Sequence, residues 1–276
     1  FFWVARMMMM GCKFMDKPPF PVIYLHAMVR DKNGDKMSKT KGNVIDPLHL
    51  INGCPAEDVS KQFQAEYPEG FPSFGADALR FTLAAMSGSG RDIKLSVERI
   101  AGYHAFANKI WNASRFVLMR LDGETPRPLN EMGDSLEAAD RYILSRLAEA
   151  IEQSTESLEA FRFADAASTV YSFFWHEFCD WYIELVKPRL LGEAGTSQDA
   201  ARSTLVSVLD SALKMLHPMM PFITEELWQK LPIERAEPSI MLSQYPAGLE
   251  AWRSPAIEQE YRYVKDAITA IRTVRS

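Results

Sequence analysis

The sequence predicts a mostly α-helical protein in which a short mixed α/β segment precedes a helical bundle. From residue 76 onward, apolar residues recur at helical spacing, loops are short and no strand-like alternation is visible. Before that point, an apolar run over residues 20–29 lies between two helical patterns, an order typical of α/β layers. With 276 residues, of which 47% are hydrophobic, the chain is long enough to bury two cores.

The first ninety residues contain the predicted α/β elements. Residues 4–15 have a helical pattern that is apolar on nearly all sides, so this helix is expected to be buried. Residues 20–29 are expected to form a strand of the buried type, and Pro21 is tolerated near its start. After a polar loop, Asp46 suits the N-cap and Pro47 the first turn of another helix.

The rest of the chain is predicted to be almost entirely helical. The expected helices cover residues 76–87, 96–121, 135–160, 163–186, 197–216, 221–231 and 255–274. The stretch Ser87-Gly88-Ser89-Gly90 is the clearest boundary signal, which divides the chain into domains 1–90 and 91–276. The aromatic block 171–182 is expected to be bundle core rather than a cofactor site.

Charge is segregated along the chain, although the net charge is only −5. Residues 1–45 carry a net +5 and residues 91–120 a net +4, while residues 121–276 carry −10. Two basic patches on an acidic body are compatible with phosphate contact at defined places. For any one patch taken alone, a solvated basic face is the simpler explanation.

Cysteines and hydropathy indicate a reducing compartment and no membrane segment. The three cysteines are far apart and have no metal-like spacing, so neither a disulfide framework nor a zinc site is predicted. No stretch approaches the run of about 18 apolar residues that a membrane helix requires.

The segment with the clearest chemical meaning is Lys36-Met37-Ser38-Lys39-Thr40-Lys41-Gly42-Asn43. Three lysines and two hydroxyls lie within six residues, between Gly34 and Gly42. Ammonium groups on a mobile loop can converge on a polyphosphate and neutralise the charge that develops on a leaving pyrophosphate. On composition alone, a solvated turn of lysines explains the segment as well.

The order of these residues resembles the class I aminoacyl-tRNA synthetases, whose ATP loop reads Lys-Met-Ser-Lys-Ser. Thr40 stands at the last place of that motif and keeps a hydroxyl. The residues around the loop (29–47), together with residues 1–7 and 111–119, look like the valyl branch more than its isoleucyl and leucyl relatives. Several separate matching segments make a chance resemblance far less probable than a lone short motif does.

The resemblance implies a fold and a reaction. The fold would be the C-terminal piece of a Rossmann-like α/β catalytic domain, followed by an all-α helical-bundle anticodon-binding domain. The reaction would be ATP-dependent activation of valine to valyl-adenylate and transfer of the valyl group to tRNA(Val), in a monomeric cytoplasmic enzyme. Mg²⁺ would arrive with ATP as substrate, so no protein-bound metal is expected.

The resemblance also assigns roles to the residues of the lysine-rich loop. Lys36 and Lys39 would be catalytic, because they would contact the phosphates and the leaving pyrophosphate. Met37, Ser38 and Thr40 would complete the ATP-binding loop, Met37 by packing near the adenine and the two hydroxyls by hydrogen bonding.

Two further contacts are expected at other places in the chain. Trp3 would form a wall of the amino-acid pocket, and its alternative role is that of an ordinary core tryptophan. Lys109 and Phe116 lie on one stripe of the 96–121 helix, with Arg115 adjacent to it, and an aromatic ring among cations suits an unstacked tRNA base. The alternative is that Phe116 packs against a neighbouring helix while the charges are solvated.

The segment 75–80 resembles the junction between the family's catalytic and helical domains, where Asp77 and Arg80 would be capping and interdomain groups. The family's His-x-Gly-His segment, editing domain and C-terminal coiled-coil arm have no counterpart in this sequence. The chain is therefore expected to be a fragment without the N-terminal half and the C-terminal arm, and inactive by itself. Two alternatives remain, an isoleucyl- or leucyl-tRNA synthetase fragment and a stand-alone helical RNA-binding or scaffold protein with a vestigial loop.

Overall fold

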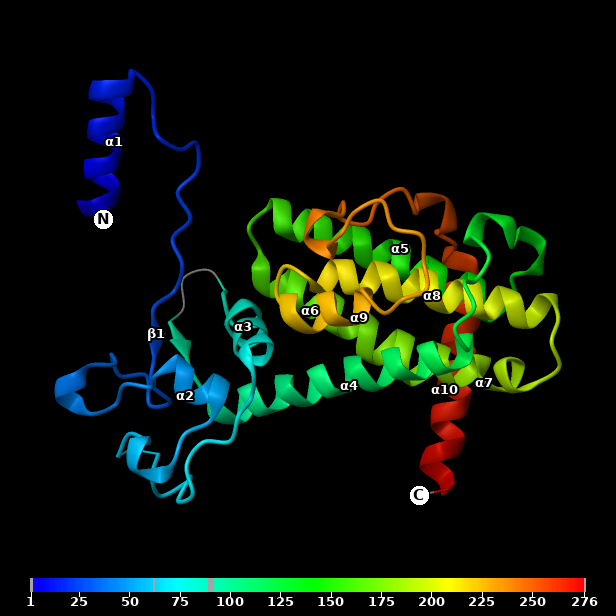
Figure 1. Ribbon diagram of the computed structural model, residues 1–276, viewed down its shortest axis with the longest axis horizontal. Helices are drawn as coiled ribbons and strands as arrows, with labels where there is room; N and C mark the ends of the chain where they lie inside the picture. Colours follow the sequence, from blue (N-terminus) through cyan, green and yellow to red (C-terminus); the bar gives the residue numbers. More distant parts are fainter. Residues whose placement is uncertain (1, 62, 89–91, 276) are drawn as a thin grey trace.

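The computed structural model describes residues 2–61, 63–88 and 92–275, and these residues are mostly helical (Figure 1). The α-helices are α1 (Phe2–Met15), α2 (Pro47–Asn52), α3 (Ala76–Ala85), α4 (Val97–Leu121), α5 (Ala138–Glu159), α6 (Phe163–Ser172), α7 (Ile183–Leu191), α8 (Thr196–Leu216), α9 (Pro221–Trp228) and α10 (Pro255–Arg275). A π-helix, η5 (Phe173–Tyr182), joins α6 to α7. Short 3-10 turns are η1 (Lys39–Lys41), η2 (Ala56–Asp58), η3 (Leu129–Glu131), η4 (Gly133–Ser135), η6 (Ile240–Leu242) and η7 (Glu250–Trp252). The predicted fold class, a small α/β segment before a helical bundle, is confirmed.

The small α/β part contains a two-stranded parallel sheet. Strand β1 (Val29–Arg30) pairs with β2 (Ile93–Lys94), and Val29 lies opposite Ile93. The predicted strand over residues 20–29 is wrong except at its C-terminal end, because a strand requires a hydrogen-bonding neighbour and only the end of this segment lies beside β2. Residues 21–26 are exposed and have no regular secondary structure.

Helix α1 forms where the sequence predicts it, but it is not buried. None of its described residues is buried, and Trp3 is 71% exposed. Figure 1 shows the helix standing apart from the rest of the molecule, at the end of an extended segment. The expectation of burial is therefore wrong for this chain: an apolar pattern predicts the helix, but burial depends on which other elements cover it.

Helix α2 begins at the predicted cap, and α4 begins one residue after the start of its predicted helix. The Asp46 carboxylate accepts a hydrogen bond from the backbone N–H of Leu48 at 2.9 Å, and Pro47 occupies the first turn of α2. Ser96 caps α4 through its hydroxyl, and the helix ends at Asp122, whose φ of 50° is left-handed.

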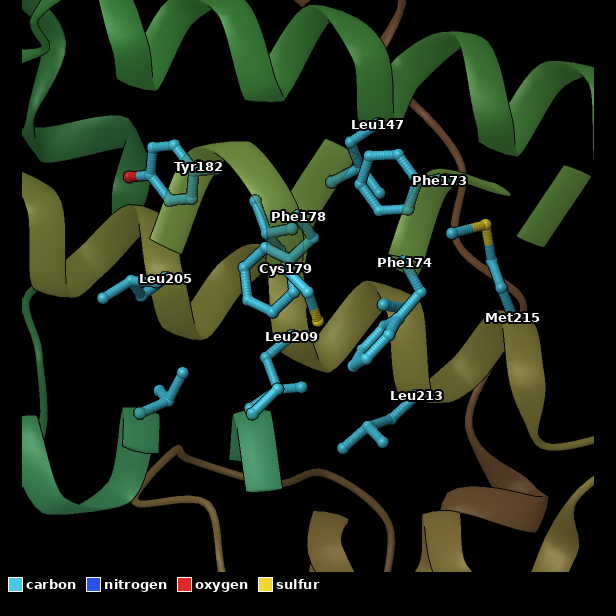
Figure 2. Close-up of a cluster of buried hydrophobic side chains, with 14 of the residues drawn as sticks. Leu147, Phe173, Phe174, Phe178, Cys179, Tyr182, Leu205, Leu209, Leu213 and Met215 are labelled. Atoms are coloured by element: carbon cyan, nitrogen blue, oxygen red, sulfur yellow. The ribbon is translucent and has the colours of Figure 1, made fainter. Parts of the chain in front are cut away.

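The large hydrophobic core lies among α4, α5, α6, η5, α7, α8 and α9. Figure 2 shows its centre, where Phe174 and Phe178 from η5 face Leu205, Leu209 and Leu213 from α8. These side chains are fully buried. The aromatic block 171–182 is therefore bundle core, as the sequence predicts.

The helix predicted over residues 163–186 is a continuous rod, but its centre is a π-helix of ten residues. A π-helix is wider than an α-helix and changes which side chains share a face. In η5 the buried residues Phe174, Phe178 and Tyr182 follow one another every four residues. The half-buried Glu177 and Asp180 remain available for polar contacts with other helices.

A smaller hydrophobic core lies under the α/β part, and it shares helices with the large one. Ala78 of α3 and Ile100 of α4 belong to the small core, while Phe81 of α3 and Phe106 of α4 belong to the large core. Both helices therefore pass from one core into the other. The division at residue 90 stays a prediction, and residues 89–91 at that boundary lie outside the described part of the chain.

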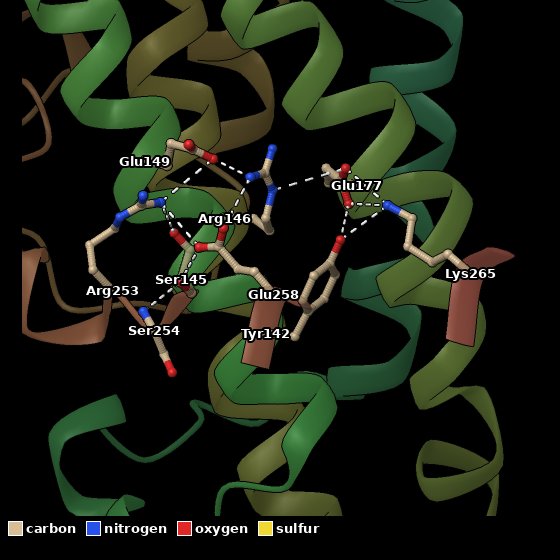
Figure 3. Close-up of polar contacts among 9 residues, drawn as sticks. All are labelled: Tyr142, Ser145, Arg146, Glu149, Glu177, Arg253, Ser254, Glu258 and Lys265. Carbon is tan, nitrogen blue, oxygen red and sulfur yellow. Dashed lines mark hydrogen bonds and ion pairs between the residues drawn. The ribbon is translucent and has the colours of Figure 1, made fainter. Parts of the chain in front are cut away.

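Helix α10 is attached to the bundle mainly through polar contacts, and none of its described residues is buried. Figure 3 shows Lys265 donating to Glu177 at 2.8 Å and to the Tyr142 hydroxyl at 3.0 Å. Just before the helix, the Ser254 N–H donates to the Ser145 hydroxyl at 2.8 Å. The same surface holds further charged contacts among Arg146, Glu149, Arg253 and Glu258.

No helix in the described residues is both long enough and apolar enough to cross a membrane.

A buried carboxylate, Asp140, fixes the start of α5. Its oxygens accept hydrogen bonds from the Tyr182 hydroxyl at 2.7 Å and from the Glu137 backbone N–H at 2.9 Å. The Arg189 guanidinium pairs with it at 2.9 Å. Burial, followed by the charge of Asp140, raises the pKa of Tyr182 well above its usual value, so Tyr182 remains a hydrogen-bond donor.

We expect Asp140→Ala to lower the free energy of unfolding by about 1–3 kcal/mol, because it leaves the buried Tyr182 hydroxyl without its carboxylate acceptor and removes one of the partners of the Arg189 guanidinium. Urea unfolding of this chain, followed by circular dichroism, measures the change. Asp134→Ala is the control, because Asp134 is exposed on the preceding turn. Equal effects of the two substitutions would contradict the anchoring role of Asp140.

Candidate functional site

The lysine-rich loop connects β1 to α2 and lies at the surface of the small α/β part. Lys36 forms an isolated antiparallel bridge with Arg30, which holds the start of the loop against β1. Met37 is half-buried and packs against the small core, while Lys36 and Thr40 are exposed. The backbone of Lys39 begins the turn η1, and its side chain lies outside the described part of the structure.

Hydroxyl groups order the middle of the loop. The Ser38 and Thr40 hydroxyls are 3.2 Å apart, within hydrogen-bond distance. The Lys41 backbone N–H lies 3.2 Å from the Ser38 carbonyl oxygen and 3.3 Å from the Ser38 hydroxyl. The predicted ATP-binding residues are thus neighbours along one short turn, on which the side chains of Lys36 and Thr40 are exposed to solvent.

Beneath the loop, Asp31 and Asn43 form a buried polar pair. The Asp31 side chain accepts hydrogen bonds from the backbone N–H groups of Asn33 at 3.0 Å and Asp35 at 2.8 Å. The Asn43 amide donates to Asp31 at 2.8 Å, and its oxygen accepts from the Ser38 N–H at 2.9 Å. The two residues therefore join both ends of the loop.

The pKa of Asp31 lies below its ordinary value. Burial by itself would raise this pKa, but hydrogen bonds from the Asn43 side chain and from the backbone of Asp35, Asn33 and Gly34 outweigh it. The carboxylate is therefore ionised at neutral pH, and its charge lies below the lysines of the loop.

Glycine is required at the first bend of the loop. Gly34 has a φ of 90°, a conformation that side chains with a Cβ rarely adopt. A Cβ at this position would also lie 3.0 Å from Cε of Lys94, which packs across the bend from β2.

The structure does not enclose Trp3 in a pocket. Its ring is 71% exposed on α1, and the Arg6 guanidinium of the same helix lies 4.7 Å from the ring centroid. The role of Trp3 in an amino-acid pocket stays a prediction.

Of the predicted RNA-contact residues on α4, Lys109 faces η5 and Phe116 faces α7. The Lys109 ammonium donates to Asp180 at 2.8 Å and lies 4.6 Å from the centroid of the Trp175 ring. His176 also faces Asp180, at 3.4 Å. Lys109 is thus held by the π-helix in a fixed position and remains about one-third exposed.

Two turns further along α4, Phe116 and Arg115 complete the predicted set. Phe116 is half-buried between two cations, with Arg120 at 5.3 Å and Lys187 at 5.7 Å from its ring. Arg115 is exposed. The side chains form a surface that combines positive charge with an aromatic ring, and their contact with RNA stays a prediction.

The junction residues Asp77 and Arg80 link α3 to the start of α9, across 138 or more residues of sequence. Asp77 accepts hydrogen bonds from the backbone N–H groups of Ile223 at 2.7 Å and Phe222 at 3.3 Å. Arg80 donates to the carbonyl oxygens of Pro218 and Met219. Both residues are therefore capping groups that connect distant parts of the chain.

Within the described residues, no group of three or more His, Cys, Asp or Glu side chains is arranged to hold a metal ion.

Asp31 and Asn43 are the residues of this site that the sequence analysis did not single out. A usable signal was present, because an Asp followed by Lys-Asn-Gly is typical of a turn in which the carboxylate accepts backbone N–H groups. The bond between Asp31 and Asn43 has no comparable local signal, because the two residues are twelve positions apart.

We expect Asp77→Asn to lower the free energy of unfolding by about 1–3 kcal/mol, because the amide places a donor of a buried side chain against one of the two backbone N–H groups that Asp77 accepts. Burial raises the pKa of Asp77, and the N–H groups of Ile223 and Phe222 and the charge of Arg80 act against that rise. Denaturant unfolding measures the loss, and Glu69→Gln at an exposed position is the matched control. An unchanged midpoint in Asp77→Asn would rule out the linking role.

Comparison with known proteins places both parts of the chain in one family. Residues 1–96 match the family model described as tRNA synthetases class I (I, L, M and V). Residues 140–276 match the model described as anticodon-binding domain of tRNA ligase.

Individual relatives agree with these matches. The whole chain is 50% identical to a valine–tRNA ligase of Geobacter sulfurreducens, 46% to one of Syntrophotalea carbinolica and 45% to one of Thermotoga maritima. It spans 29%, 28% and 29% of their lengths, respectively.

A solved structure supports the fold. The crystal structure of a LeuRS–tRNA–LeuAMS ternary complex from Agrobacterium radiobacter K84 aligns with 91% of this chain and 27% of that one, with a TM-score of 0.65 and 21% identity. The chain belongs to the class I aminoacyl-tRNA synthetases, in the group that the matched family model denotes by I, L, M and V.

Proposed function

We propose that this chain is the part of a valine–tRNA ligase that supplies the lysine-rich ATP loop and a tRNA-binding helical bundle. The observation that carries the proposal is that the whole chain is 43–50% identical to five valine–tRNA ligases. The presence of the Lys36–Thr40 segment on an exposed, ordered loop supports it.

In the proposed reaction, the valine carboxylate attacks the α-phosphorus of MgATP and pyrophosphate leaves. Lys36 and Lys39 neutralise negative charge on the departing phosphates, an electrostatic contribution that is largest in the transition state. Ser38 and Thr40 hold the turn through their hydroxyl contact, and Met37 attaches it to the small core. These roles are the ones that the resemblance to the class I aminoacyl-tRNA synthetases implies for this loop.

The second proposed partner is tRNA(Val), which would contact the face of α4 that carries Lys109, Arg115 and Phe116. A half-buried ring bordered by cations offers a stacking surface to an unpaired base and donors to its phosphates. We further propose that the enzyme works as a cytoplasmic monomer.

The activity is tested with the full-length gene product in an ATP–pyrophosphate exchange assay. We expect exchange that depends on valine, with isoleucine and leucine as the competing substrates to compare. Exchange with isoleucine or leucine but not with valine would show the amino-acid assignment to be wrong.

RNA contact is tested separately with Phe116→Ala in the same protein. Loss of a stacking surface is worth about 1–3 kcal/mol per base, so the KM for tRNA should rise about fivefold or more. Valine-dependent exchange should remain unchanged. Met119→Ala, at an exposed position on the same helix, is the control and should leave the KM for tRNA as it is. Loss of exchange and tRNA charging together in Phe116→Ala would instead indicate a packing role.

A further inference from the structure

The lysine-rich loop is held mainly by one buried pair of side chains, Asp31 and Asn43. Asp31 is 1% exposed and Asn43 is 6% exposed, whereas most residues between them are exposed or half-buried. In the loop itself, Met37 is the side chain that packs against the small core. The position of the exposed ammonium groups therefore depends on the backbone to which they are attached.

Asn43 of this pair forms hydrogen bonds with the backbone of two predicted ATP-binding residues, Lys36 and Ser38. The Asn43 oxygen accepts from the backbone N–H of Ser38, and its amide donates to the Lys36 carbonyl oxygen at 3.3 Å. The same amide donates to Asp31 at 2.8 Å. Asp31 in turn receives the N–H groups of Asn33 and Asp35, directly before Lys36. The backbone on both sides of Lys36 is thus fixed by two side chains.

The direction of each hydrogen bond is also fixed. An ionised Asp31 only accepts, so the Asn43 amide must donate to it, and the Asn43 oxygen is then left for the Ser38 N–H. An amide at position 31 would place two donors against each other. A carboxylate at position 43 would place two negative charges against each other.

We propose that Asp31 and Asn43 are positioning residues of the ATP loop: their buried hydrogen-bond pair sets the backbone that aims Lys36 and Lys39 at the phosphates. The assignment rests on the proposed function, because it gives the pair a role in that reaction. Neither side chain needs to touch the nucleotide.

The test uses three variants of the full-length gene product: Asp31→Asn, Asn43→Asp and the double variant that carries both. The double variant exchanges carboxylate and amide, so a complementary donor and acceptor face each other again between positions 31 and 43, while the bond from position 43 to the Lys36 carbonyl oxygen is lost. Asp35→Asn is the matched control, since it makes the same charge change in the same loop at an exposed side chain. Thermal unfolding confirms that each variant is folded.

We expect each single variant to lower kcat/KM for ATP in pyrophosphate exchange by about tenfold or more, with the KM for valine unchanged. The double variant should be more active than either single variant, because coupled partners give non-additive effects, but it should not reach the wild type, since Asp at position 43 cannot donate to the Lys36 carbonyl oxygen. Asp35→Asn should stay within about twofold of the wild type. Simple removal of negative charge near ATP would instead favour binding in both Asp31→Asn and Asp35→Asn.

A second measurement on the 276-residue chain does not depend on activity. Trypsin cleaves after Lys39 and Lys41 only when the loop opens, so the rate reports how firmly the loop is held. Cleavage should be about tenfold faster in Asp31→Asn and Asn43→Asp, and slower in the double variant than in either single variant.

The outcomes separate this inference from the proposed function. Absence of valine-dependent exchange in the wild type would overturn the function, while the trypsin rates would still test whether the pair holds the loop. Normal exchange in the wild type, with Asp31→Asn indistinguishable from Asp35→Asn, would overturn the positioning role. A double variant with no more exchange activity and no more protection than the single variants would do the same.

Discussion

Helices α3 and α4 each contribute to two hydrophobic cores, and the arrangement of the other elements depends on this sharing. Ile100 near the start of α4 is buried in the small core, and Phe106, less than two turns later, is buried in the large core. The helix has 25 residues, which corresponds to about 37 Å at 1.5 Å per residue. The lysine-rich loop and the bundle are therefore connected by a rigid element, and the hydrogen bonds of Asp77 and Arg80 to the start of α9 add a second connection.

Local sequence patterns predicted the positions of the helices well, but they predicted burial and strand pairing poorly. The helices after residue 76 could be located because apolar residues recur every three or four positions. Helix α2 could be located because Asp46 is a cap whose chemistry acts within one turn. Two predictions were wrong: that residues 20–29 form a buried strand, and that the helix α1 is buried. Burial and strand pairing depend on distant neighbours, and β2 meets only the end of that segment.

The candidate site was predictable to a similar extent. The order of residues in the lysine-rich loop carries a family signature, so the sequence alone could locate the ammonium and hydroxyl groups. The buried pair beneath them could not be located, because it joins positions twelve residues apart through side chains that are common in any polar turn. The π-helix was missed for a related reason: its apolar spacing resembles that of an α-helix, and yet it is η5 that places Asp180 against Lys109.

The attachment of α10 differs in kind from the packing of the bundle. Its contacts with α5 and η5 combine hydrogen bonds and ion pairs, such as Lys265 with Glu177, with stacking of the Tyr261 ring on the Tyr142 ring at 4.5 Å between centroids. None of its described residues is buried. Dissolved ions screen attraction between charges, but much less where the pair is partly buried, as Lys265 and Glu177 are at 21% and 16% exposed. Rising ionic strength is therefore expected to weaken the docking of the C-terminal helix only in part.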